Sequence, residues 1–463
     1  MNAWDMDPAA AVARARWLAP GALAALQRER LVGLLRHAVA ASAFYRDSLR
    51  GIDVERTPLA GLPVVRKAAL MRRFDEWVTD PEVRLPAVKA FAADPTRIGD
   101  LFLGRYAVWE SSGSRGEPGI FLQDPQALAV YDALERQRPA PLRPLQRLLD
   151  PFWLTERVAF VGATDGHFAS QASLQRLRRM APWLADRWAG MSILQPLPAL
   201  LQSLQDFAPT ILTTYPTAAS MLAEASADGR LDLRLSEVWT GGETLGTAQR
   251  GRIESVFGCP LRNSYGASEF LPIAAECSVG ALHLNADWVI LEPVDERWRP
   301  VPPGTLSHTT LLTNLANRVQ PLIRYDIGDR ILLHAARCSC GSPLPVIEVQ
   351  GRCDDLLALA GPHGRTVRLL PLALSTVLEE EAGLFDFRLE QTGPSTLQLW
   401  LTAGRSAGAA VLALQRHAEG QGALPVEVRV GTLPRLPRGR SGKLQRIVRC
   451  GTAAAQPPKR RSR

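Results

Sequence analysis

Short apolar stretches alternate with amphipathic helical patterns between residues 157 and 257. The stretches at 157–162, 211–215 and 237–240 have the length of strands, and helical patterns follow the second and third of them. Strands joined through helices are parallel, and the connection between two such strands is right-handed. The alternation therefore predicts an α/β domain with a largely parallel sheet and flanking helices.

The segments on either side of this alternation have different patterns. The first fifty residues are rich in Ala, Leu and Arg and predict a helical lead-in. Further along, β-rich segments at 288–292, 306–313, 321–326 and 331–334 are separated by Gly, Pro and Asp turns, which indicates an antiparallel sheet. We therefore expect one large N-terminal domain over residues 1–352, with mixed sheets, flanking helices and an antiparallel β part.

A separate pattern begins near residue 353. It contains predicted helices at 370–381 and 411–417, with predicted strands between and after them, which is enough for an independent small α+β domain. We expect this domain to span residues 353–455. The basic segment 456–463 that follows is expected to be a disordered tail.

Charge and hydropathy exclude several classes of protein. No uncharged apolar run reaches the ~20 residues of a membrane helix, and the N-terminus lacks the basic-then-apolar order of a signal peptide. We therefore expect a cytoplasmic protein without membrane insertion. The formal net charge is +8, but four cationic residues lie among the last five, which leaves +4 for the rest. With no zinc-finger, helix-turn-helix or RNA-binding signature, we expect no nucleic-acid partner.

Lysine is rare in this chain. Of 54 basic residues only four are lysine, at positions 67, 89, 443 and 459. Arginine therefore serves wherever positive charge alone is needed. A lysine at a particular place carries more weight, because an ammonium is a compact point charge on a movable stem, whereas a guanidinium is a broad planar fork.

Residues 110–119, Glu-Ser-Ser-Gly-Ser-Arg-Gly-Glu-Pro-Gly, form a loop rich in hydroxyls and glycine. Hydroxyls and unshielded backbone N–H groups bind phosphate oxygens, and glycine permits a close approach. The loop is not a Walker loop, because no Gly-Lys-Ser/Thr follows. Taken alone, it is also compatible with an ordinary surface turn.

Four further segments carry groups suited to a nucleotide. Residues 240–243 follow a strand directly, and nucleotides bind at the carboxyl ends of parallel strands. Residues 263–269 supply an aromatic face, a hydroxyl and a carboxylate suited to Mg²⁺. Residues 325–329 place a carboxylate on a tight turn, and 434–443 is a Gly- and Pro-rich loop that ends in Lys443.

The order and spacing of these five motifs resemble the acyl-adenylate-forming superfamily, and in particular its phenylacetate-coenzyme A ligase-like branch. The resemblance spans nearly the whole chain, from residues 63–67 to Lys443. It implies a large adenylate-forming domain followed by a small mobile domain that carries the catalytic lysine. The implied reaction activates a carboxylic acid as acyl-AMP with ATP and then passes the acyl group to a thiol.

The resemblance also implies roles for individual residues. Lys443, Glu269 and Ser268 would be catalytic, with Mg²⁺ on Glu269, and Asp354 would be the hinge. The implied ATP-binding residues are Ser111, Ser112, Gly113, Ser114, Gly116, Gly242, Glu243, Asn263, Tyr265, Gly266, Asp329 and Arg352. The residues that fall where the family has its substrate walls are His167, Phe168, Tyr215 and Ala267. An aromatic acid fits these four positions, which are also compatible with plain loop and core residues.

The chain departs from the family at two places. Arg115 stands where the phosphate loop usually has its second hydroxyl, and Glu117 and Gly119 flank Pro118 where the family has a lysine beside the proline. The turn at 360–365 also differs from the Arg-Gly-rich turn that helps to shape the thiol tunnel of the phenylacetate enzymes. The acceptor is therefore open between coenzyme A and the phosphopantetheine of an acyl carrier protein.

A second constellation consists of Cys277 and His283 together with Cys338 and Cys340. Three thiols and one imidazole are a suitable tetrahedral set for zinc, and the spacing is not that of a standard finger. We expect a structural rather than a catalytic zinc. The alternative is that the cysteines are small buried apolar residues and that His283 is a hydrogen-bonded histidine of a sheet.

These observations lead to an expected function. We expect an ATP- and Mg²⁺-dependent ligase for an aryl carboxylic acid, with coenzyme A as the acceptor that the resemblance favours. Three alternatives are an acyl carrier protein as acceptor, an adenylyltransferase that moves AMP onto a hydroxyl without forming a thioester, and a non-catalytic ATP- or acyl-binding relative. The sequence is compatible with a homodimer.

Overall fold

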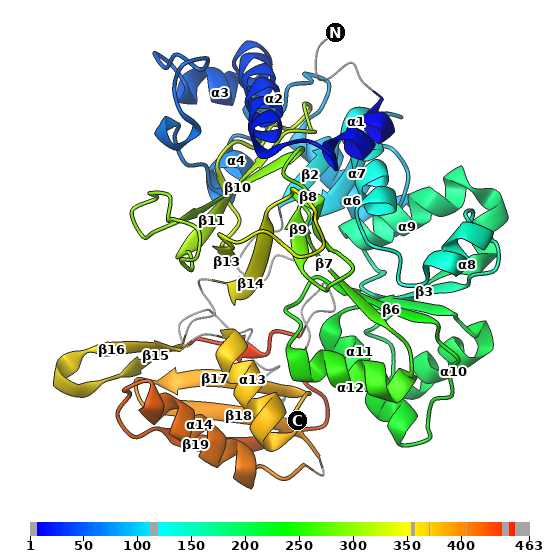
Figure 1. Ribbon diagram of the computed structural model, residues 1–463, viewed down its shortest axis with the longest axis vertical. Helices are drawn as coiled ribbons and strands as arrows, with labels where there is room; N and C mark the ends of the chain where they lie inside the picture. Colours follow the sequence, from blue (N-terminus) through cyan, green and yellow to red (C-terminus); the bar gives the residue numbers. More distant parts are fainter. Residues whose placement is uncertain are drawn as a thin grey trace, which may run out of the picture. The chain divides into compact units, whose positions relative to one another are not determined.

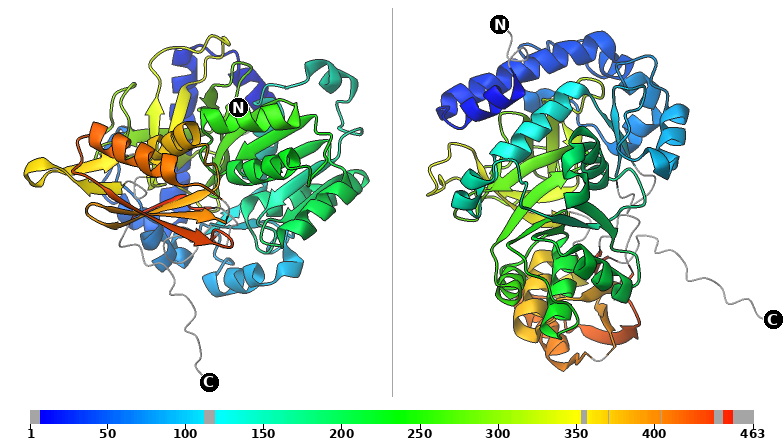
Figure 2. Two further views of the ribbon diagram at one scale, coloured as in Figure 1. Left: turned by 90° about the horizontal axis from the view of Figure 1, so that it is seen from below. Right: turned by 90° about the vertical axis from the view of Figure 1, so that its right-hand side faces the viewer.

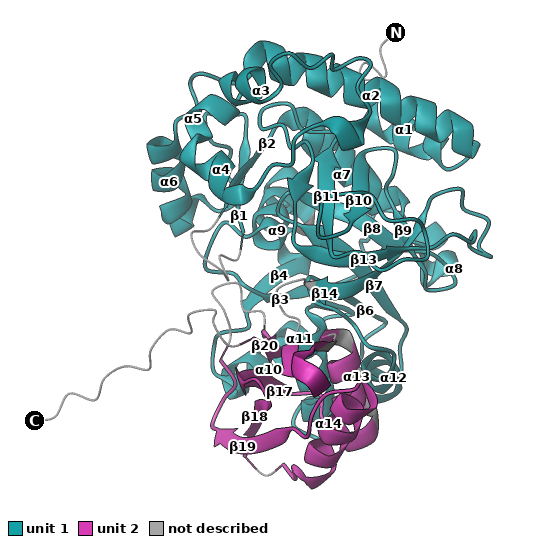
Figure 3. Ribbon diagram, turned by 90° about the vertical axis from the view of Figure 1, so that its left-hand side faces the viewer, with its two compact units in different colours: residues 1–353, 438–443 teal, residues 354–437, 444–463 magenta. Residues whose placement is uncertain are grey.

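The computed structural model describes residues 7–111, 119–352, 357–369, 371–403, 405–437 and 444–449 (Figure 1). The chain divides into two compact units, which Figure 3 shows in different colours. The described residues up to 352 belong to the first unit, and the later ones belong to the second. The expected tail at 456–463 lies outside the described residues.

In the first unit six α-helices precede the first strand, six more alternate with strands up to Phe257, and the described residues after that contain strands but no α-helix. Its α-helices are α1 (Pro8–Ala15), α2 (Pro20–Ala41), α3 (Ala43–Ser48), α4 (Lys67–Arg72), α5 (Phe74–Trp77), α6 (Leu85–Ala93), α7 (Pro125–Gln137), α8 (Pro144–Leu149), α9 (Ala169–Met180), α10 (Leu197–Phe207), α11 (Pro216–Ala227) and α12 (Thr247–Phe257). Short 3-10 helices lie at Leu59–Gly61, Pro95–Arg97 and Pro182–Arg187. Among the described residues, no helix is both long enough and apolar enough to cross a membrane.

One mixed sheet organises the first unit, with the strand order β13-β14-β9-β8-β7-β6-β5-β3-β4. Its strands are β3 (Val158–Gly162), β4 (Trp188–Ser192), β5 (Ile211–Thr214), β6 (Glu237–Gly241), β7 (Leu261–Ala267), β8 (Phe270–Glu276), β9 (Leu282–Leu284), β13 (Asp329–Leu333) and β14 (Val346–Arg352). The pairs from β4 to β7 are parallel, and those from β7 to β13 are antiparallel. The predicted α/β class, with a parallel part and an antiparallel part, is confirmed.

Two smaller sheets complete this unit. They are the β1-β2 pair, Ala107–Glu110 with Ile120–Gln123, and the antiparallel sheet β10-β11-β12, formed by Val289–Val294, Thr309–Asn314 and Tyr325–Asp326. The long helix α2, drawn in blue, lies along the outside of the unit (Figure 2). It buries Leu23, Leu31, Leu34, Leu35 and Ala38 on one face. This spacing is that of an amphipathic helix packed on a core, as the first fifty residues predict.

The parallel strands are apolar because helices shield the sheet they form. Every residue of β3 is buried, and the apolar residues of β3, β5 and β6 form one core with those of α10, α11 and α12. Strands covered on both faces have near-continuous apolar runs rather than an alternating pattern. Helix α10 contributes Leu200, Leu201 and Leu204 to this core and ends at Ala208, which has a left-handed conformation with φ of 48°.

Two strands differ from the prediction. The edge strand β4 has no buried residue and no alternating apolar pattern, so its sequence carries no strand signal. The predicted strand at 321–326 pairs only over β12, Tyr325–Asp326. Its preceding residue Arg324 has a φ of 49°, which no strand residue adopts, and its buried guanidinium binds the carbonyl oxygen of Ala60 and the carboxylate of Glu292.

The second unit is an α+β structure, as its sequence pattern predicts. A four-stranded sheet of order β19-β18-β17-β20 contains Glu427–Leu433, Thr396–Thr402, Phe387–Gly393 and Ile447–Val448. A hairpin forms from β15 (Leu357–Ala360) and β16 (Thr366–Leu369), with a 3-10 turn at Pro362–Gly364. Helices α13 (Pro371–Ala382) and α14 (Gly408–Gly420) pack with the sheet in a core of their own.

We predict that Leu204→Ala lowers the free energy of unfolding of the first unit by ~2–5 kcal/mol, because Leu204 is fully buried and its truncation leaves a cavity. Leu148→Ala is the matched control, since Leu148 is 77% exposed on the same unit. We expect it to change the stability by less than ~0.5 kcal/mol. Urea unfolding followed by tryptophan fluorescence measures both, and similar midpoints for the two variants would contradict the assigned core.

Candidate functional site

The turn between β7 and β8 carries two of the predicted catalytic residues. β7 ends at Ala267 and β8 begins at Phe270, so Ser268 and Glu269 alone make the turn. The pairing shifts register between Tyr265 and Ala267. A Cβ atom at Gly266 would lie 1.8 Å from the backbone oxygen of Leu271, so only glycine allows the two strands to approach this closely.

Buried amide side chains hold the backbone of this turn. Asn314 Nδ2 donates to the carbonyl oxygen of Glu269 at 3.0 Å, and Gln123 Nε2 donates to that of Ser268 at 3.4 Å. The hydroxyl of Tyr131 links the two amides, since it accepts from Asn314 Nδ2 at 2.9 Å and donates to Gln123 Oε1 at 3.0 Å. The sequence analysis missed these three residues, because each lies in an ordinary strand or helix with no motif around it.

Two tyrosines orient the two predicted carboxylates. The hydroxyl of Tyr265 donates to Asp329 Oδ2 at 2.6 Å, and that of Tyr325 donates to Glu269 Oε1 at 2.9 Å. Each bond joins the β7–β8 segment to the 325–329 motif. Hydrogen bonds to a carboxylate are stronger than neutral ones, so the two motifs are held together at the carboxylates themselves.

The base of the predicted phosphate loop lies beside the same turn. Ser268 Oγ donates to the carbonyl oxygen of Glu110 at 3.1 Å. The next residue, Ser111, pairs with Gly119 through Ser111 N to Gly119 O at 2.8 Å and Gly119 N to Ser111 Oγ at 2.7 Å. The structure therefore brings Ser111 to Ser268 and Glu269. The other predicted loop residues, Ser112, Gly113, Ser114 and Gly116, lie outside the described residues.

The residues predicted on the adenine side lie within β7 and just after the end of β6. Asn263 Oδ1 accepts a hydrogen bond from the Thr240 hydroxyl at 2.9 Å, which joins the two strands. Gly242, with φ of 77°, turns the chain after β6. Glu243 Oε2 then accepts from the backbone N–H of Thr217 at 3.1 Å, in the first turn of α11.

Three predicted residues are described only partly or not at all. Arg352 pairs with Asp329 along the β13–β14 ladder, but its side chain lies outside the described part of the structure. The hinge Asp354 and the lysine Lys443 are themselves outside it. Their predicted roles therefore rest on the sequence.

Two of the four predicted acyl-pocket residues have interior side chains. His167 is buried, with Nε2 3.4 Å from the backbone oxygen of Asp94 and its ring 5.2 Å from that of Phe91. Burial lowers the pKa of His167, which favours a neutral ring. Tyr215 is also buried, and its hydroxyl accepts from the backbone N–H of Ala163 at 3.3 Å.

The other two predicted acyl-pocket residues lie beside the turn that carries Ser268 and Glu269. Phe168 is half-buried and forms a parallel bridge with Glu110, the residue whose carbonyl binds Ser268. Ala267 directly precedes Ser268. Phe168 and Ala267 are therefore the predicted substrate residues that the structure brings to the rest of the site.

The predicted zinc ligands converge at one place. The ligand atoms of Cys277, His283, Cys338 and Cys340 all lie within 4.8 Å of one another. The Sγ atoms of Cys277 and Cys338 are 3.8 Å apart, and Cys340 Sγ is 3.4 Å from His283 Nε2. Tetrahedral zinc with Zn–S bonds of ~2.3 Å has sulfur atoms ~3.8 Å apart, so the spacing fits the ion. It is far too long for a disulfide.

The surroundings of the cluster favour metal binding. His283 Nδ1 donates to the carbonyl oxygen of Leu344 at 2.8 Å, which leaves Nε2 directed at the thiols. A hydrogen bond from the Cys340 backbone N–H lowers the pKa of Cys338, while burial raises that of Cys340 to about 11. Bound zinc would lower the pKa of both cysteines, because the ion is bound by thiolates. The ion would join the β8–β9 hairpin to the β13–β14 loop.

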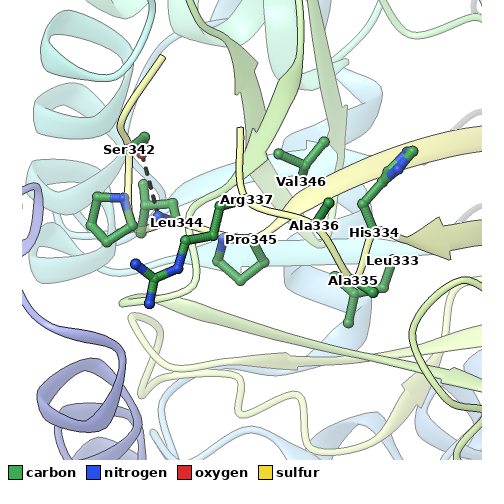
Figure 4. Close-up of a pocket in the computed structure, with 10 residues that line it drawn as sticks. Leu333, His334, Ala335, Ala336, Arg337, Ser342, Leu344, Pro345 and Val346 are labelled. Carbon is green, nitrogen blue, oxygen red and sulfur yellow. Dashed lines mark hydrogen bonds between the residues drawn. The ribbon is translucent and has the colours of Figure 1, made fainter. Parts of the chain in front are cut away.

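Figure 4 shows residues at the end of β13, in the β13–β14 loop and at the start of β14. Residues 333–337 and 342–346 line a hollow of ≈ 240 Å³ there. Its wall is held in part by a hydrogen bond from Leu344 N to Ser342 Oγ at 3.3 Å. None of the predicted nucleotide or acyl residues lines this hollow.

Comparison with solved structures identifies the fold. The structure of 2-hydroxyisobutyryl-CoA ligase in the postadenylation state aligns over 91% of this chain and 88% of its own, with a TM-score of 0.63 and 19% identity. The anthranilate CoA ligase AuaEII, in complex with anthranoyl-AMP, aligns over 73% of this chain and 65% of its own, with a TM-score of 0.51 and 17% identity. The chain has the acyl-adenylate-forming fold. The fold expected from the five motifs is therefore confirmed.

The sequence match to a curated protein covers much less of the chain than the structural matches do. Protein CapK of Staphylococcus aureus is 29% identical over 135 residues, which is 29% of this chain and 28% of CapK. The match therefore spans little more than a quarter of that protein. No family model matches the chain.

We predict that the purified protein holds about one zinc ion per chain and that Cys338→Ser lowers both the zinc content and the melting temperature, because loss of one of four ligands weakens a structural site. Elemental analysis by mass spectrometry and thermal unfolding measure the two effects. Cys259→Ala is the control, since Cys259 is a buried thiol outside the cluster. Zinc-free protein that also takes up no added zinc would contradict the assignment.

Proposed function

We propose that the chain is an AMP-forming acid-thiol ligase, which activates a carboxylic acid as acyl-AMP and transfers the acyl group to the thiol of coenzyme A. The observation that carries the proposal is that hydrogen bonds between segments far apart in the sequence hold Ser268, Glu269 and Asp329 together. Ser111 directly follows Glu110, whose carbonyl oxygen accepts the hydrogen bond from Ser268. These are the positions that the resemblance assigns to phosphates, metal and ribose. The acyl-adenylate-forming fold supports the same reading.

The chemistry of acyl-AMP formation explains why the site would use a serine, carboxylates and a lysine. A carboxylate that attacks the α-phosphate of ATP brings two anions together, so the reaction needs cations and hydrogen-bond donors rather than a strong base. Glu269 would hold Mg²⁺, which supplies positive charge at the phosphates. Ser268 would donate to the α-phosphate, and Asp329 would accept from the ribose hydroxyls. Lys443 would bring an ammonium to the bond being made.

The second half-reaction would need the second unit in a different position from the one that brings Lys443 to the bond in the first half-reaction. A thiol must reach the carbonyl carbon of the acyl-AMP, and the catalytic lysine would occupy space near that path. A hinge at Asp354 that swings the small domain would clear it. ATP and coenzyme A are both cytoplasmic, and we place the reaction there.

We favour an aryl acid as substrate. Phe168 and Ala267 lie next to the catalytic turn and would offer an aromatic face and room for a ring. Of the two aligned ligases, 2-hydroxyisobutyryl-CoA ligase was solved with R3-HIB-AMP and AuaEII with anthranoyl-AMP.

An acid-dependent ATP/pyrophosphate exchange screen tests the proposal. Benzoate, phenylacetate, hydroxybenzoates, amino acids and fatty acids form the panel, and we expect exchange with an aryl acid. Coenzyme A and a holo acyl carrier protein are then offered separately with the active acid. A stable AMP-modified product without a thioester would instead indicate an adenylyltransferase, and no exchange with any acid would indicate a non-catalytic relative.

We predict that Lys443→Ala slows acyl-AMP formation by ~10²–10³, the effect of losing one charge-stabilising donor. Thioester formation from synthetic acyl-AMP and coenzyme A should change little, because the lysine is needed only in the first step. Lys459→Ala is the control, since it removes a lysine from the basic tail. Equal loss in both half-reactions would contradict the role of Lys443.

A further inference from the structure

The segment 141–155 turns its apolar side chains to solvent. It contains the short helix α8 and part of the loop that leads to β3, and α8 lies at the periphery of the first unit in Figure 1 and Figure 3. Five large apolar residues of this segment are each between 48% and 80% exposed. They are Leu145, Leu148, Leu149, Phe152 and Leu154, and we call them the α8 patch. Single exposed leucines are normal on a protein surface, but a cluster of this size within ten residues marks an interaction site.

The charged residues of the same segment are directed at the protein. Arg143 binds two buried carboxylates, those of Glu237 at 2.9 Å and Glu156 at 2.6 Å. Arg147 also binds Glu156, at 3.2 Å, and Asp150 is buried. Within 141–155 every exposed residue is therefore uncharged. An ordinary solvated helix has the opposite arrangement, with its charges outward and its apolar side chains inward.

The segment is anchored, so the α8 patch is a fixed surface. Asp150 Oδ1 accepts a hydrogen bond from the backbone N–H of Leu154 at 2.8 Å. The guanidinium of Arg147 lies 3.5 Å over the ring of Trp153, and Trp153 meets Trp239 of β6 edge to face, with the ring centroids 5.2 Å apart. A backbone that is already ordered loses little conformational entropy when a partner binds.

The size of the patch matches the apolar share of a dimer interface. The exposed parts of its five side chains amount to roughly 500 Å² of apolar surface. A stable interface buries ~800 Å² on each partner, and about 65% of a homodimer interface is apolar, which is ~520 Å². The α8 patch alone therefore supplies about as much apolar surface as one subunit of a standard homodimer contributes.

The lack of charge on the patch indicates which partner it fits. In a twofold contact each group lies near its own copy, so a charged patch would repel itself and an uncharged patch does not. A lipid surface fits less well, because helices that bind membranes present cations beside their apolar face. Here Arg143 and Arg147 bind carboxylates of the protein instead.

We propose that the α8 patch is the contact surface of a homodimer, with α8 of one subunit packed against α8 of the other across a twofold axis. In such a contact each subunit covers the same five side chains of its partner. The patch contains none of the predicted nucleotide, acyl or metal residues, so the inference goes beyond the ligase function and does not depend on it.

The test compares the wild type with two variants of the patch, Leu149→Arg and Phe152→Ala, and with Leu412→Arg as control. Leu412 is an exposed leucine of α14 in the second unit, so the control adds the same charge outside the patch. Analytical ultracentrifugation from about 1 to about 100 µM protein measures the dissociation constant of the dimer. Far-UV circular dichroism shows whether each variant is folded.

We expect the wild type and Leu412→Arg to change from monomer to dimer over this range. Leu149→Arg should raise the dissociation constant by at least ~10²-fold, because two arginines would meet in an apolar interface. Phe152→Ala should raise it by ~10-fold without adding charge. Because association adds to the stability of a dimer, the unfolding of Leu148→Ala is compared with that of the wild type at a concentration where both are monomers.

Three results would overturn the proposal. The wild type could stay monomeric at about 100 µM, well above the dissociation constant of a specific interface of this size. Folded Leu149→Arg and Phe152→Ala could form the dimer as well as the wild type does, which would place the interface elsewhere. Monomeric wild type could bind vesicles of anionic phospholipid, with the binding weakened by Phe152→Ala, which would make a lipid surface the partner.

Discussion

Two buried amides hold the carbonyl oxygens of a two-residue turn, and the geometry of the candidate site follows from this interaction. Gln123 and Asn314 are almost fully buried, and the Tyr131 hydroxyl connects them. An unpaired buried polar group costs ~1–3 kcal/mol, so the turn and the amides stabilise each other. Ser268 and Glu269 are thereby presented in one orientation, without the entropy loss that ordering a loose loop would require.

The electrostatics of the site require positive charge from elsewhere in the chain. Two carboxylates, Glu269 and Asp329, are held within hydrogen-bond reach of tyrosines from each other's segment, and a polyanionic substrate is proposed to bind beside them. The predicted phosphate loop carries both Arg115 and Glu117, so further positive charge would have to come from other segments. In the proposed ligase reaction, a site divided in this way would react only when all its charges are assembled, as two successive half-reactions require.

The cysteine-histidine cluster lies on strands that extend the same mixed sheet. β14 pairs with β9 through only two residue pairs, His283 with Val346 and Leu282 with Ile347. A metal bound between these strands would reinforce this short pairing. Because β14 in turn pairs with β13, which begins at Asp329, the ion would support the position of a carboxylate without taking part in the reaction.

The sequence by itself determined the parallel sheet and the antiparallel part, and it predicted the importance of Ser268 and Glu269 and the grouping of Cys277, His283, Cys338 and Cys340, because these depend on local periodicity or on ordered motifs. It could not predict the edge strand β4, nor that the strand predicted at 321–326 would pair only over β12, because these conformations are set by neighbours rather than by their own patterns. Only the tertiary structure revealed Gln123, Tyr131 and Asn314 behind the turn and Tyr325 on Glu269. The physical reason is that hydrogen bonds and packing join residues separated by 45 or more positions, and no local pattern marks which distant partner will meet which.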